Sequence, residues 1–231
     1  MEKVAAIIVA GGSGKRMGMG IKKQFITLRG KTVLAHAIEA FNKSEIIDEI
    51  IVVVGKEDQE KVKRDIVDFY QYTKVSQIVA GGAERQDSVY NGLMATSKEV
   101  KYVMIHDGAR PFISETVLEN ALAYTKEKEA TVVAVPVKDT IKIVNTELEV
   151  EATPNRSTLW SVQTPQSFKR ELLIKAYQYA HEKNLQVTDD SMLVEAYGHK
   201  VYVVEGEYNN IKITTPEDLM IGEAILKEKA K

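Results

Sequence analysis

Glycines and cations near the start of the chain are spaced in a way that suits polyphosphate chemistry. The run Ala10-Gly11-Gly12-Ser13-Gly14 is followed closely by Arg16, Lys22 and Lys23. Glycines let backbone N–H groups turn toward a ligand, and cations offset the charge that grows on phosphoryl oxygens during transfer. The segment therefore predicts a polyphosphate site at which a phosphoryl-type transfer takes place.

Two common glycine motifs do not fit this loop. A P-loop needs Gly-Lys-Ser/Thr at its end, and Gly14-Lys15 is followed here by Arg16. The dinucleotide pattern requires a third small residue where Met17 stands. The loop on its own also leaves open a plain tight turn after an edge strand, with Arg16 as a solvated cation.

Further polar residues follow the other predicted strands. Asp107 comes directly after an apolar run and suits a divalent cation held by phosphates, because Mg²⁺ takes oxygen ligands. Capping of the next turn or pairing with Arg110 is the alternative role. We expect His106 to be structural, and Asp189 and Asp190 to begin a helix. The segments that should meet these at one sheet edge are Gly81–Ser88, Gln163–Gln166 and Asn209–Thr214.

Alternating strands and helices must position these residues. Apolar runs predict strands at Val4–Val9, Glu49–Val54, Val75–Val79, Tyr102–His106, Thr131–Val135 and Val201–Val204. Amphipathic stretches and caps predict helices at Glu57–Tyr70, Asp87–Ala95, Ser114–Glu129 and Lys169–Glu182, and from Thr188 and Thr215 onward. This alternation predicts an α/β fold, with a Rossmann-like, mostly parallel sheet and helices on both faces.

The alternation breaks between residues 137 and 159. Charged and apolar residues alternate there, as in Lys138-Asp139-Thr140-Ile141-Lys142-Ile143, and a second extended stretch follows. The pattern predicts a two-stranded β-arm projecting from the sheet. An isolated hairpin is barely stable in water, so the arm must pack on something. We expect that to be its copy in a second subunit; a hairpin folded back on its own domain is the alternative.

Composition bounds the remaining possibilities. The 231 residues suffice for a single domain, and a net charge of −2 gives no broad basic field for nucleic acid. There is no cysteine, which excludes disulfides and fits a reducing compartment. No apolar run reaches the ~20 residues that span a bilayer. The sequence enters its first predicted strand at once, so we expect no signal peptide. We therefore expect a cytoplasmic protein that binds neither nucleic acid nor membrane.

The loops resemble a known family along essentially the whole chain. AGGSGKRMG with KKQF, GGAERQDSV, HDGARP, VPVKDTIK, RSTLWSVQTPQSF, TDD and NIKITTPEDL are similar to motifs of the 2-C-methyl-D-erythritol 4-phosphate cytidylyltransferases of the non-mevalonate isoprenoid pathway. The resemblance implies that CTP and a polyol phosphate give a CDP-polyol and pyrophosphate, with Mg²⁺ or another divalent cation. The whole of 1–231 would then be one nucleotidyltransferase domain.

The resemblance also assigns roles at the triphosphate. Arg16 and Lys23 would stabilise the pentacoordinate α-phosphorus, Lys212 would contact the α-phosphate, and Asp107 would lie near the metal. Gly11, Gly12 and Gly14 belong to the loop that holds the triphosphate. The acceptor already carries an ionised phosphate, so alignment and charge stabilisation suffice and no general base is required.

The remaining substrate contacts follow from the same resemblance. Gly11, Gly82 and Ser88 are the candidates for cytosine and ribose. The polyol phosphate would meet Thr140, Arg156, Thr164 and Thr188. Arg110 is a further candidate for substrate binding. The family is a homodimer with exchanged arms, which would place Thr140 and Arg156 in the partner's site.

One departure and two alternatives accompany the resemblance. Asn209 stands where the family often has an acidic residue, so one polyol contact is expected to differ. Ribitol-5-phosphate cytidylyltransferases share the loops and arm, but Arg156-Ser157-Thr158-Leu159-Trp160 and Thr188-Asp189-Asp190 favour the erythritol enzyme. A non-catalytic nucleotide-binding module is the alternative of another class. Retention of Arg16, Lys23 and Lys212 argues against it, because these charges act mainly in the transition state.

Overall fold

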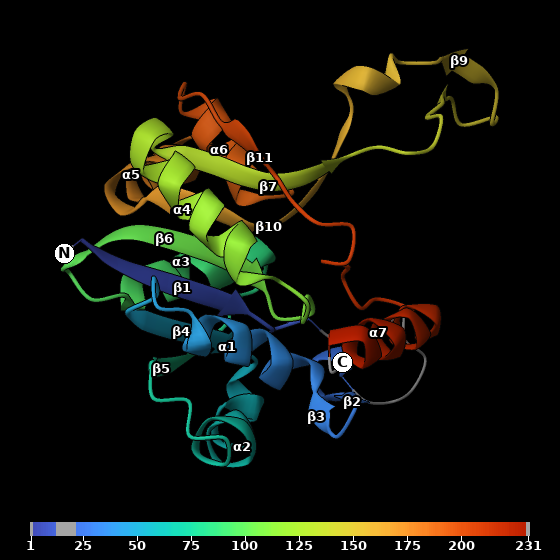
Figure 1. Cartoon of the computed structure of the whole chain (residues 1–231). Helices are drawn as coiled ribbons and strands as arrows, with labels where there is room; N and C mark the ends of the chain where they lie inside the picture. Colours follow the sequence, from blue (N-terminus) through green and yellow to red (C-terminus); the bar gives the residue numbers. More distant parts are fainter. Residues whose placement is uncertain (1, 13–21, 230–231) are drawn as a thin grey trace.

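The central sheet explains how loops from distant parts of the chain reach one edge. The computed structural model describes residues 2–12 and 22–229, and within them seven strands pair in the order β11-β7-β10-β6-β1-β4-β5 (Figure 1). Neighbours are parallel except at β10, which runs antiparallel to β6 and β7. The strands are β1 (Lys3–Val9), β4 (Glu49–Val54), β5 (Val75–Ala80), β6 (Val100–Asp107), β7 (Ala130–Pro136), β10 (Trp160–Lys169) and β11 (Tyr202–Glu205).

Helices cover both faces of this sheet, as predicted. Side chains alternate across a strand, so Ala6 and Ile8 of β1 enter one core while Ala5 and Ile7 enter the other. The first core lies under α1 (Val33–Lys43), α2 (Gln59–Val62) with the π-helical η4 (Lys63–Asp68), and α4 (Glu115–Lys128); the second lies under α3 (Arg85–Ala95), α5 (Arg170–Lys183) and α6 (Asp190–Ala196). None of the helices in the described ranges combines the length and apolar composition needed to cross a bilayer.

A smaller core near the carboxyl edge joins the two ends of the chain. Leu28 and Val33 pack there with Phe112, Ile213 and Ile225. These side chains come from the hairpin β2 (Thr27–Leu28) and β3 (Lys31–Thr32), from α1, and from α7 (Pro216–Lys229), which lies beside the hairpin in Figure 1. Nothing in the sequence analysis predicted α1 or the hairpin, although Thr32 caps α1 by accepting a hydrogen bond from Ala35 N at 3.2 Å.

Local capping fixes where the other helices begin. Ser114 caps α4, as predicted, by accepting from Val117 N at 3.3 Å. Helix α3 starts at Arg85, two residues earlier than predicted, because Glu84 and Asp87 form a reciprocal capping box there. Asp189 caps α6 by accepting from Met192 N at 3.0 Å, which confirms the helix start at the two aspartates.

The expectation that Gln163–Gln166 forms a loop is wrong. These residues belong to β10, whose pairing with β7 shifts register between Val162 and Gln166. Pro165 lies in that shift, where the ladder needs no N–H from it. Since β10 is antiparallel, its first residue Trp160 lies opposite Pro136 at the end of β7. Its early residues therefore still reach the carboxyl edge of the sheet.

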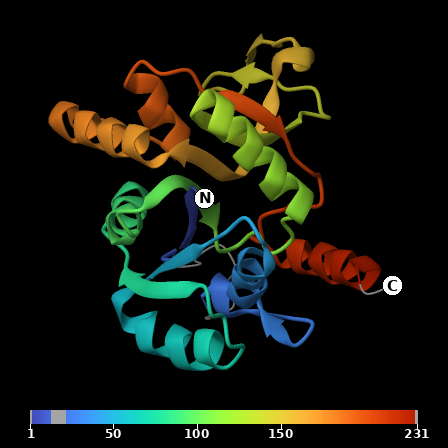
Figure 2. The same cartoon turned by 60° about the vertical axis from the view of Figure 1, so that its left-hand side comes forward.

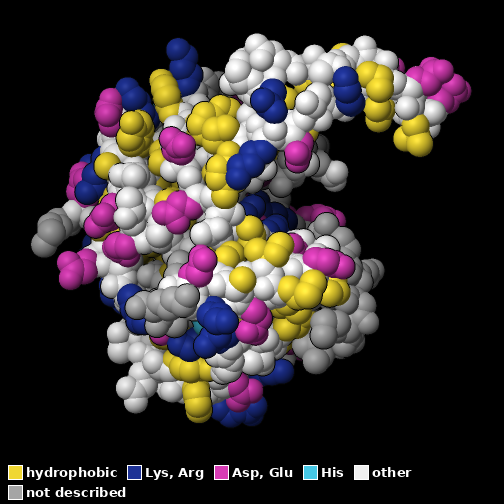
Figure 3. Space-filling model, turned by 45° about the vertical axis from the view of Figure 1, so that its right-hand side comes forward, with side chains coloured by type: hydrophobic (Ala, Val, Ile, Leu, Met, Phe, Trp, Pro, Cys, Tyr) yellow, Lys and Arg dark blue, Asp and Glu magenta, His cyan; other side chains and the backbone are white. Residues whose placement is uncertain are grey.

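The segment 137–159 forms the predicted projecting arm. It leaves the sheet between β7 and β10 and stands off the body, at the opposite end of the molecule from α2 (Figures 1 and 2). It contains the antiparallel pair β8 (Ile143–Val144) and β9 (Val150–Ala152) and the turn η5 (Arg156–Thr158). Apolar side chains lie exposed along it, including Leu148 at 81% and Val150 at 59% (Figure 3).

Candidate active site

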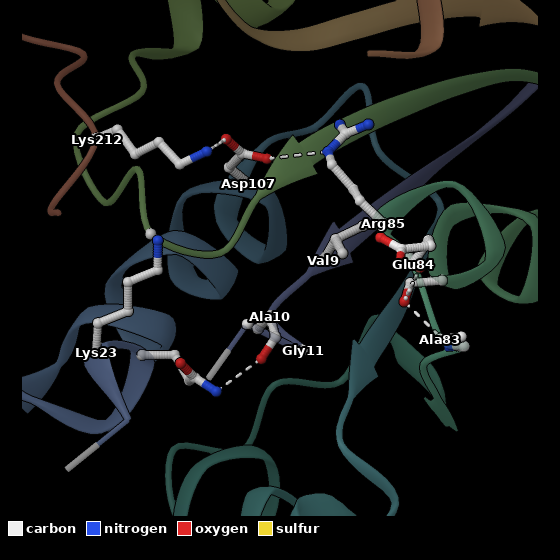
Figure 4. A pocket seen from close by; sticks show the side chains of 14 residues that line it. Val9, Ala10, Gly11, Lys23, Ala83, Glu84, Arg85, Asp107 and Lys212 are labelled. Carbon is white, nitrogen blue, oxygen red and sulfur yellow. Dashed lines mark hydrogen bonds and ion pairs between the residues drawn. The ribbon is translucent and has the colours of Figure 1, made fainter. Parts of the chain in front are cut away.

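A cavity of about 390 Å³ opens at the carboxyl ends of β1 and β6. Strand β1 lies between β4 and β6 in the sheet. The chain adds β4 and β5 on one side of β1 and the later strands on the other, so β1 marks a topological switch point. Open α/β sheets bind ligands at the carboxyl ends of the strands at such a point. In Figure 4, Lys23 and Lys212 lie on one side of the cavity and Ala83, Glu84 and Arg85 on the other. The lining residues are Val9, Ala10, Gly11, Gly12, Lys23, Gln24, Gly82, Ala83, Glu84, Arg85, Ser88, Asp107, Ala109 and Lys212.

The glycine turn after β1 forms the floor between these two sides. Its first residue, Ala10, donates its N–H to Val53 O at 2.7 Å and accepts from Gln24 Nε2 at 2.8 Å. A Cβ built on Gly12 would meet no atom within 4 Å, so packing of the described residues does not require glycine there. Gly14 and Arg16 lie outside the described residues.

The loop between β5 and α3 forms the opposite wall and is closely packed. Ser88 Oγ accepts from Gly82 N at 3.1 Å and donates to Glu84 O at 3.0 Å. A Cβ on Gly82 would lie 2.2 Å from Asp87 Cβ, so a larger residue cannot fit. The predicted base-side residues Gly11, Gly82 and Ser88 therefore do line one cavity.

Asp107 is surrounded by cations at the end of β6. Lys212 Nζ lies 2.6 Å from Asp107 Oδ2, and Arg110 Nε lies 3.9 Å from the same oxygen. Arg85 Nε lies 3.9 Å from the other oxygen, Oδ1. Burial opposes ionisation of Asp107, but Lys212, Arg85 and Arg110 outweigh it and lower the pKa to about 2. The carboxylate is therefore ionised at neutral pH.

His106 and Thr164 form a hydrogen-bonded chain with the backbone of Asp107. His106 is fully buried, and its Nε2 lies 2.9 Å from Arg110 O, so this nitrogen carries the proton. Its Nδ1 then accepts from Thr164 Oγ1 at 3.0 Å, while Thr164 Oγ1 accepts from Asp107 N at 3.1 Å. Burial lowers the pKa of His106 to about 4. His106 is thus neutral and structural, as expected, and the Thr164 hydroxyl is occupied within the protein.

Arg110 fixes the segment that carries Lys212. Its Nη1 donates to Asn210 O at 2.8 Å, and Ile213 N donates to Ala109 O at 2.8 Å. Asn210 is buried and donates from Nδ2 to Thr164 O at 2.9 Å. The C-terminal segment is therefore held on both sides of Lys212, which directs the lysine toward Asp107 (Figure 4).

Arg85 was not among the residues predicted from sequence. Besides its approach to Asp107, its Nη2 lies 2.8 Å from Asp190 Oδ2. A signal was present, because Arg85 occupies the first position of α3, where the positive end of the helix dipole disfavours a cation. A cation in that place needs a partner elsewhere in the fold.

The residues predicted to contact the polyol phosphate do not all lie close together within one chain. Thr140 and Arg156 lie on the arm, where Arg156 Nη1 donates to Lys138 O at 2.7 Å, and neither lines the cavity. Thr188 is exposed just before α6, and Thr164 is buried beside Asp107. The structure brings the nucleotide-side residues together and leaves the polyol side divided between body and arm.

A divalent cation would find a single available carboxylate in the cavity wall. Asp107 and Glu84 are the acidic residues among those lining it, and the Glu84 side chain accepts from the first turn of α3. Residues 2–12 and 22–229 contain no group of three or more potential acidic or histidine ligands. The donor set fits a metal that takes one protein oxygen and completes its shell with phosphate oxygens and water.

Fold and site together define a class of enzyme. A mostly parallel α/β sheet that gathers a glycine turn, two lysines and an ionised aspartate at its switch point is the architecture of a nucleotidyltransferase. The family model described as "IspD: 2-C-methyl-D-erythritol 4-phosphate cytidylyltransferase" matches residues 4–228. The chain belongs to this family, which confirms the resemblance inferred from its motifs.

Individual relatives agree with the family match. Proteins named 2-C-methyl-D-erythritol 4-phosphate cytidylyltransferase from Alkaliphilus oremlandii and Clostridioides difficile are 51% and 50% identical to the chain. These alignments cover 99% and 96% of this chain and 97% and 93% of the relatives. Family membership makes the chain an enzyme and counts against a non-catalytic binding module.

Solved structures show the same fold. The 4-diphosphocytidyl-2C-methyl-D-erythritol synthase of Anaerococcus prevotii superposes with a TM-score of 0.85 at 36% identity, covering 98% of this chain and 99% of that one. The Francisella tularensis 2-C-methyl-D-erythritol 4-phosphate cytidylyltransferase superposes with a TM-score of 0.82 at 31% identity, covering 96% and 99%. The predicted mostly parallel α/β fold is confirmed.

Proposed function

We propose that the chain transfers CMP from CTP to 2-C-methyl-D-erythritol 4-phosphate, giving 4-diphosphocytidyl-2-C-methyl-D-erythritol and pyrophosphate. A phosphate oxygen of the acceptor bonds to the α-phosphorus of CTP, and the bond from that phosphorus to the oxygen bridging toward the β-phosphate breaks. The observation that carries this proposal is the convergence of Lys23, Lys212 and the Gly11-Gly12 turn on one cavity.

Charge stabilisation accounts for the chemistry in this proposal. Lys23 and Lys212, together with Arg16, offset the negative charge that accumulates around the five-coordinate α-phosphorus. The acceptor phosphate is ionised at neutral pH, so no side chain needs to take a proton from it. His106 agrees with this, because it is buried and both of its ring nitrogens have partners within the protein.

The opposite wall of the cavity suits the nucleoside. Gly11, Gly82 and Ser88 line the cavity and would contact cytosine and ribose. Gly12 and Gly14 would bind the triphosphate. Asp107 would supply one oxygen to Mg²⁺ or another divalent cation, whose other ligands would be phosphate oxygens and water. When bound, such a cation neutralises phosphate charge and so favours attack on the α-phosphorus.

The polyol phosphate would lie between the body of one chain and the arm of another. Thr164, Thr188 and Arg110 belong to the body, whereas Thr140 and Arg156 lie on the projecting arm. The arm exposes apolar side chains and has a β-pair too short to be stable by itself, which supports a homodimer with exchanged arms. The absence of cysteine supports a cytoplasmic location.

Pyrophosphate release provides the test. The purified chain with CTP and Mg²⁺ is given methylerythritol phosphate or ribitol 5-phosphate in parallel. Preference for methylerythritol phosphate supports the proposal. Preference for ribitol 5-phosphate would identify it as the substrate, and Asn209 would be the first residue to substitute in order to test the cause of that preference. Release with neither acceptor would contradict the proposed transfer.

A further inference from the structure

Arg85 lies between two carboxylates that come from different parts of the fold. Asp107 ends β6 in the central sheet, and Asp190 begins α6 on one of its faces. Arg85 Nη2 lies 2.8 Å from Asp190 Oδ2, and Arg85 Nε lies 3.9 Å from Asp107 Oδ1. The guanidinium also lines the cavity, so it joins α6 to the cavity wall.

Asp190 is held in place independently of Arg85. Tyr177 OH donates to Asp190 Oδ1 at 2.8 Å, and both side chains are buried. Gln166 Oε1 in β10 accepts from Asp190 N and Ser191 N at 3.0 Å each, while its Nε2 donates to Asp189 Oδ2 at 2.9 Å. Asp190 is therefore a fixed anchor, and it holds the guanidinium of Arg85 rather than the reverse.

The two oxygens of Asp107 have different neighbours. Lys212 and Arg110 approach Oδ2, whereas Arg85 is the cation that approaches Oδ1 within the described ranges. A carboxylate with cations on one oxygen is free to turn about its bond to Cβ. A guanidinium on the second oxygen opposes that rotation, and a planar fork suits contacts with two carboxylates at once.

We propose that Arg85 is a positioning residue for nucleotidyl transfer. Anchored by buried Asp190 at the start of α6, beside Thr188, it orients the Asp107 carboxylate at the end of β6. The nucleotide side and the acceptor side of the site are thereby kept at a fixed distance from each other. This inference rests on the proposed function, because its readout is the transfer reaction.

A double-substitution cycle separates positioning from simple charge compensation. Arg85→Gln leaves the buried Asp190 without its cation, so the variant should unfold at a lower temperature and turn over more slowly. Asp190→Asn keeps an acceptor for Tyr177 and removes the uncompensated charge. The double variant should therefore regain most of the unfolding temperature, while kcat stays at least about tenfold below wild type. Its Kd for CTP, titrated without acceptor, should change by less than about threefold.

Two further variants sharpen the comparison. Arg85→Lys carries the charge without the fork and cannot bridge both carboxylates, so it should recover stability better than kcat. Arg64→Gln is the matched control, since Arg64 is exposed and pairs with its neighbour Asp65. It should behave as wild type in both measurements.

Three outcomes would overturn the inference. Full recovery of kcat in the double variant would show that Arg85 serves only to compensate the charge of Asp190. A loss of CTP affinity as large as the loss of kcat would make Arg85 a ligand contact. Full rescue of kcat by Arg85→Lys would show that the positive charge suffices without the planar fork. Failure of the proposed function is distinct from these, because wild type would then release no pyrophosphate with methylerythritol phosphate.

Discussion

Lys212 Nζ lies 2.6 Å from Asp107 Oδ2, although the two residues come from opposite halves of the chain. Arg110 and Asn210 fix the segment that carries the lysine, so the pair is held at the cavity rather than being a mobile surface contact. Lys23 lines the same side of the cavity. Two lysines at one side of a cavity and an ionised carboxylate next to them form the charged half of the site.

Removing either lysine should slow transfer more than it weakens CTP binding. Lys23→Ala and Lys212→Ala are each expected to lower kcat by about 10²–10³, because the charge they offset is largest in the transition state. The Kd for CTP should rise by less than about tenfold. Steady-state pyrophosphate release and calorimetric titration measure the two quantities. Lys43→Ala, an exposed lysine on α1, is the control; equal losses in kcat and affinity would contradict the transition-state role.

Two of the glycines that line the cavity should respond differently to alanine. In Gly12→Ala the new methyl group meets no atom of the described residues within 4 Å, so thermal unfolding should be unchanged or slightly raised, while CTP affinity falls because the methyl group occupies ligand space. Gly82→Ala places a Cβ 2.2 Å from Asp87 Cβ, so it should lower the unfolding temperature. Calorimetric unfolding with and without CTP tests both. Unchanged CTP affinity in Gly12→Ala would show that CTP does not contact that turn.

Buried His106 should make the fold less stable in mild acid. Its pKa is about 4 in the folded protein against 6.5 when unfolded, so between these values only the unfolded chain binds the proton. Stability contributed by neutral His106 is therefore complete above pH 6.5 and falls by about 2–3 kcal/mol by pH 4.5. Asp107, with a pKa lowered to about 2, adds a further loss only below about pH 4.

Denaturant unfolding from pH 7 to 4.5 tests this dependence. The partly buried His36 also has a lowered pKa and contributes in the same direction, so the comparison is made with His106→Gln. That variant should be less stable at pH 7, because bonds to Arg110 O and Thr164 are lost, but its stability should change less with pH. An identical pH slope in both proteins would contradict the assignment.

Exchange of arms predicts complementation between two inactive variants. In a heterodimer of Lys212→Ala and Arg156→Ala, one of the two sites has a body with Lys212 and receives an arm with Arg156. Heterodimers purified with two different affinity tags should therefore regain up to about half of the wild-type rate, since one site in two is intact. Each homodimer serves as its own inactive control. Heterodimers without activity would place Arg156 in the site of its own chain.

Much of the fold was predictable because its signals are local. The strand predicted at Glu49–Val54 is confirmed at both ends, and the caps at Ser114 and Asp189 lie where their spacing indicated. Runs of β-branched residues and capping side chains act within a few residues, so the sequence displays them directly. The glycine turn, Lys23, Asp107 and Lys212 were likewise predicted as site residues from the sequence motifs.

Other features depended on contacts that no local pattern records. Gln163–Gln166 was expected to be a loop that follows the arm, but pairing with β6 and β7 makes it part of β10. Thr164 was assigned to the acceptor, and the structure shows its hydroxyl bonded to His106 and Asp107. A strand in the middle of a sheet is stabilised by its neighbours, which can outweigh its own propensity.

The sequence determined which chemistry-bearing residues this protein has and, through its motifs, the family to which it belongs. Tertiary structure decided which of them lie close together: Lys212 beside Asp107, and Arg85 beside both Asp107 and Asp190. The physical reason is that ion pairs act through space over a few ångströms, whereas sequence patterns act along the chain. Only folding the sheet brings the ends of β1 and β6, the start of α6 and the C-terminal segment within that range.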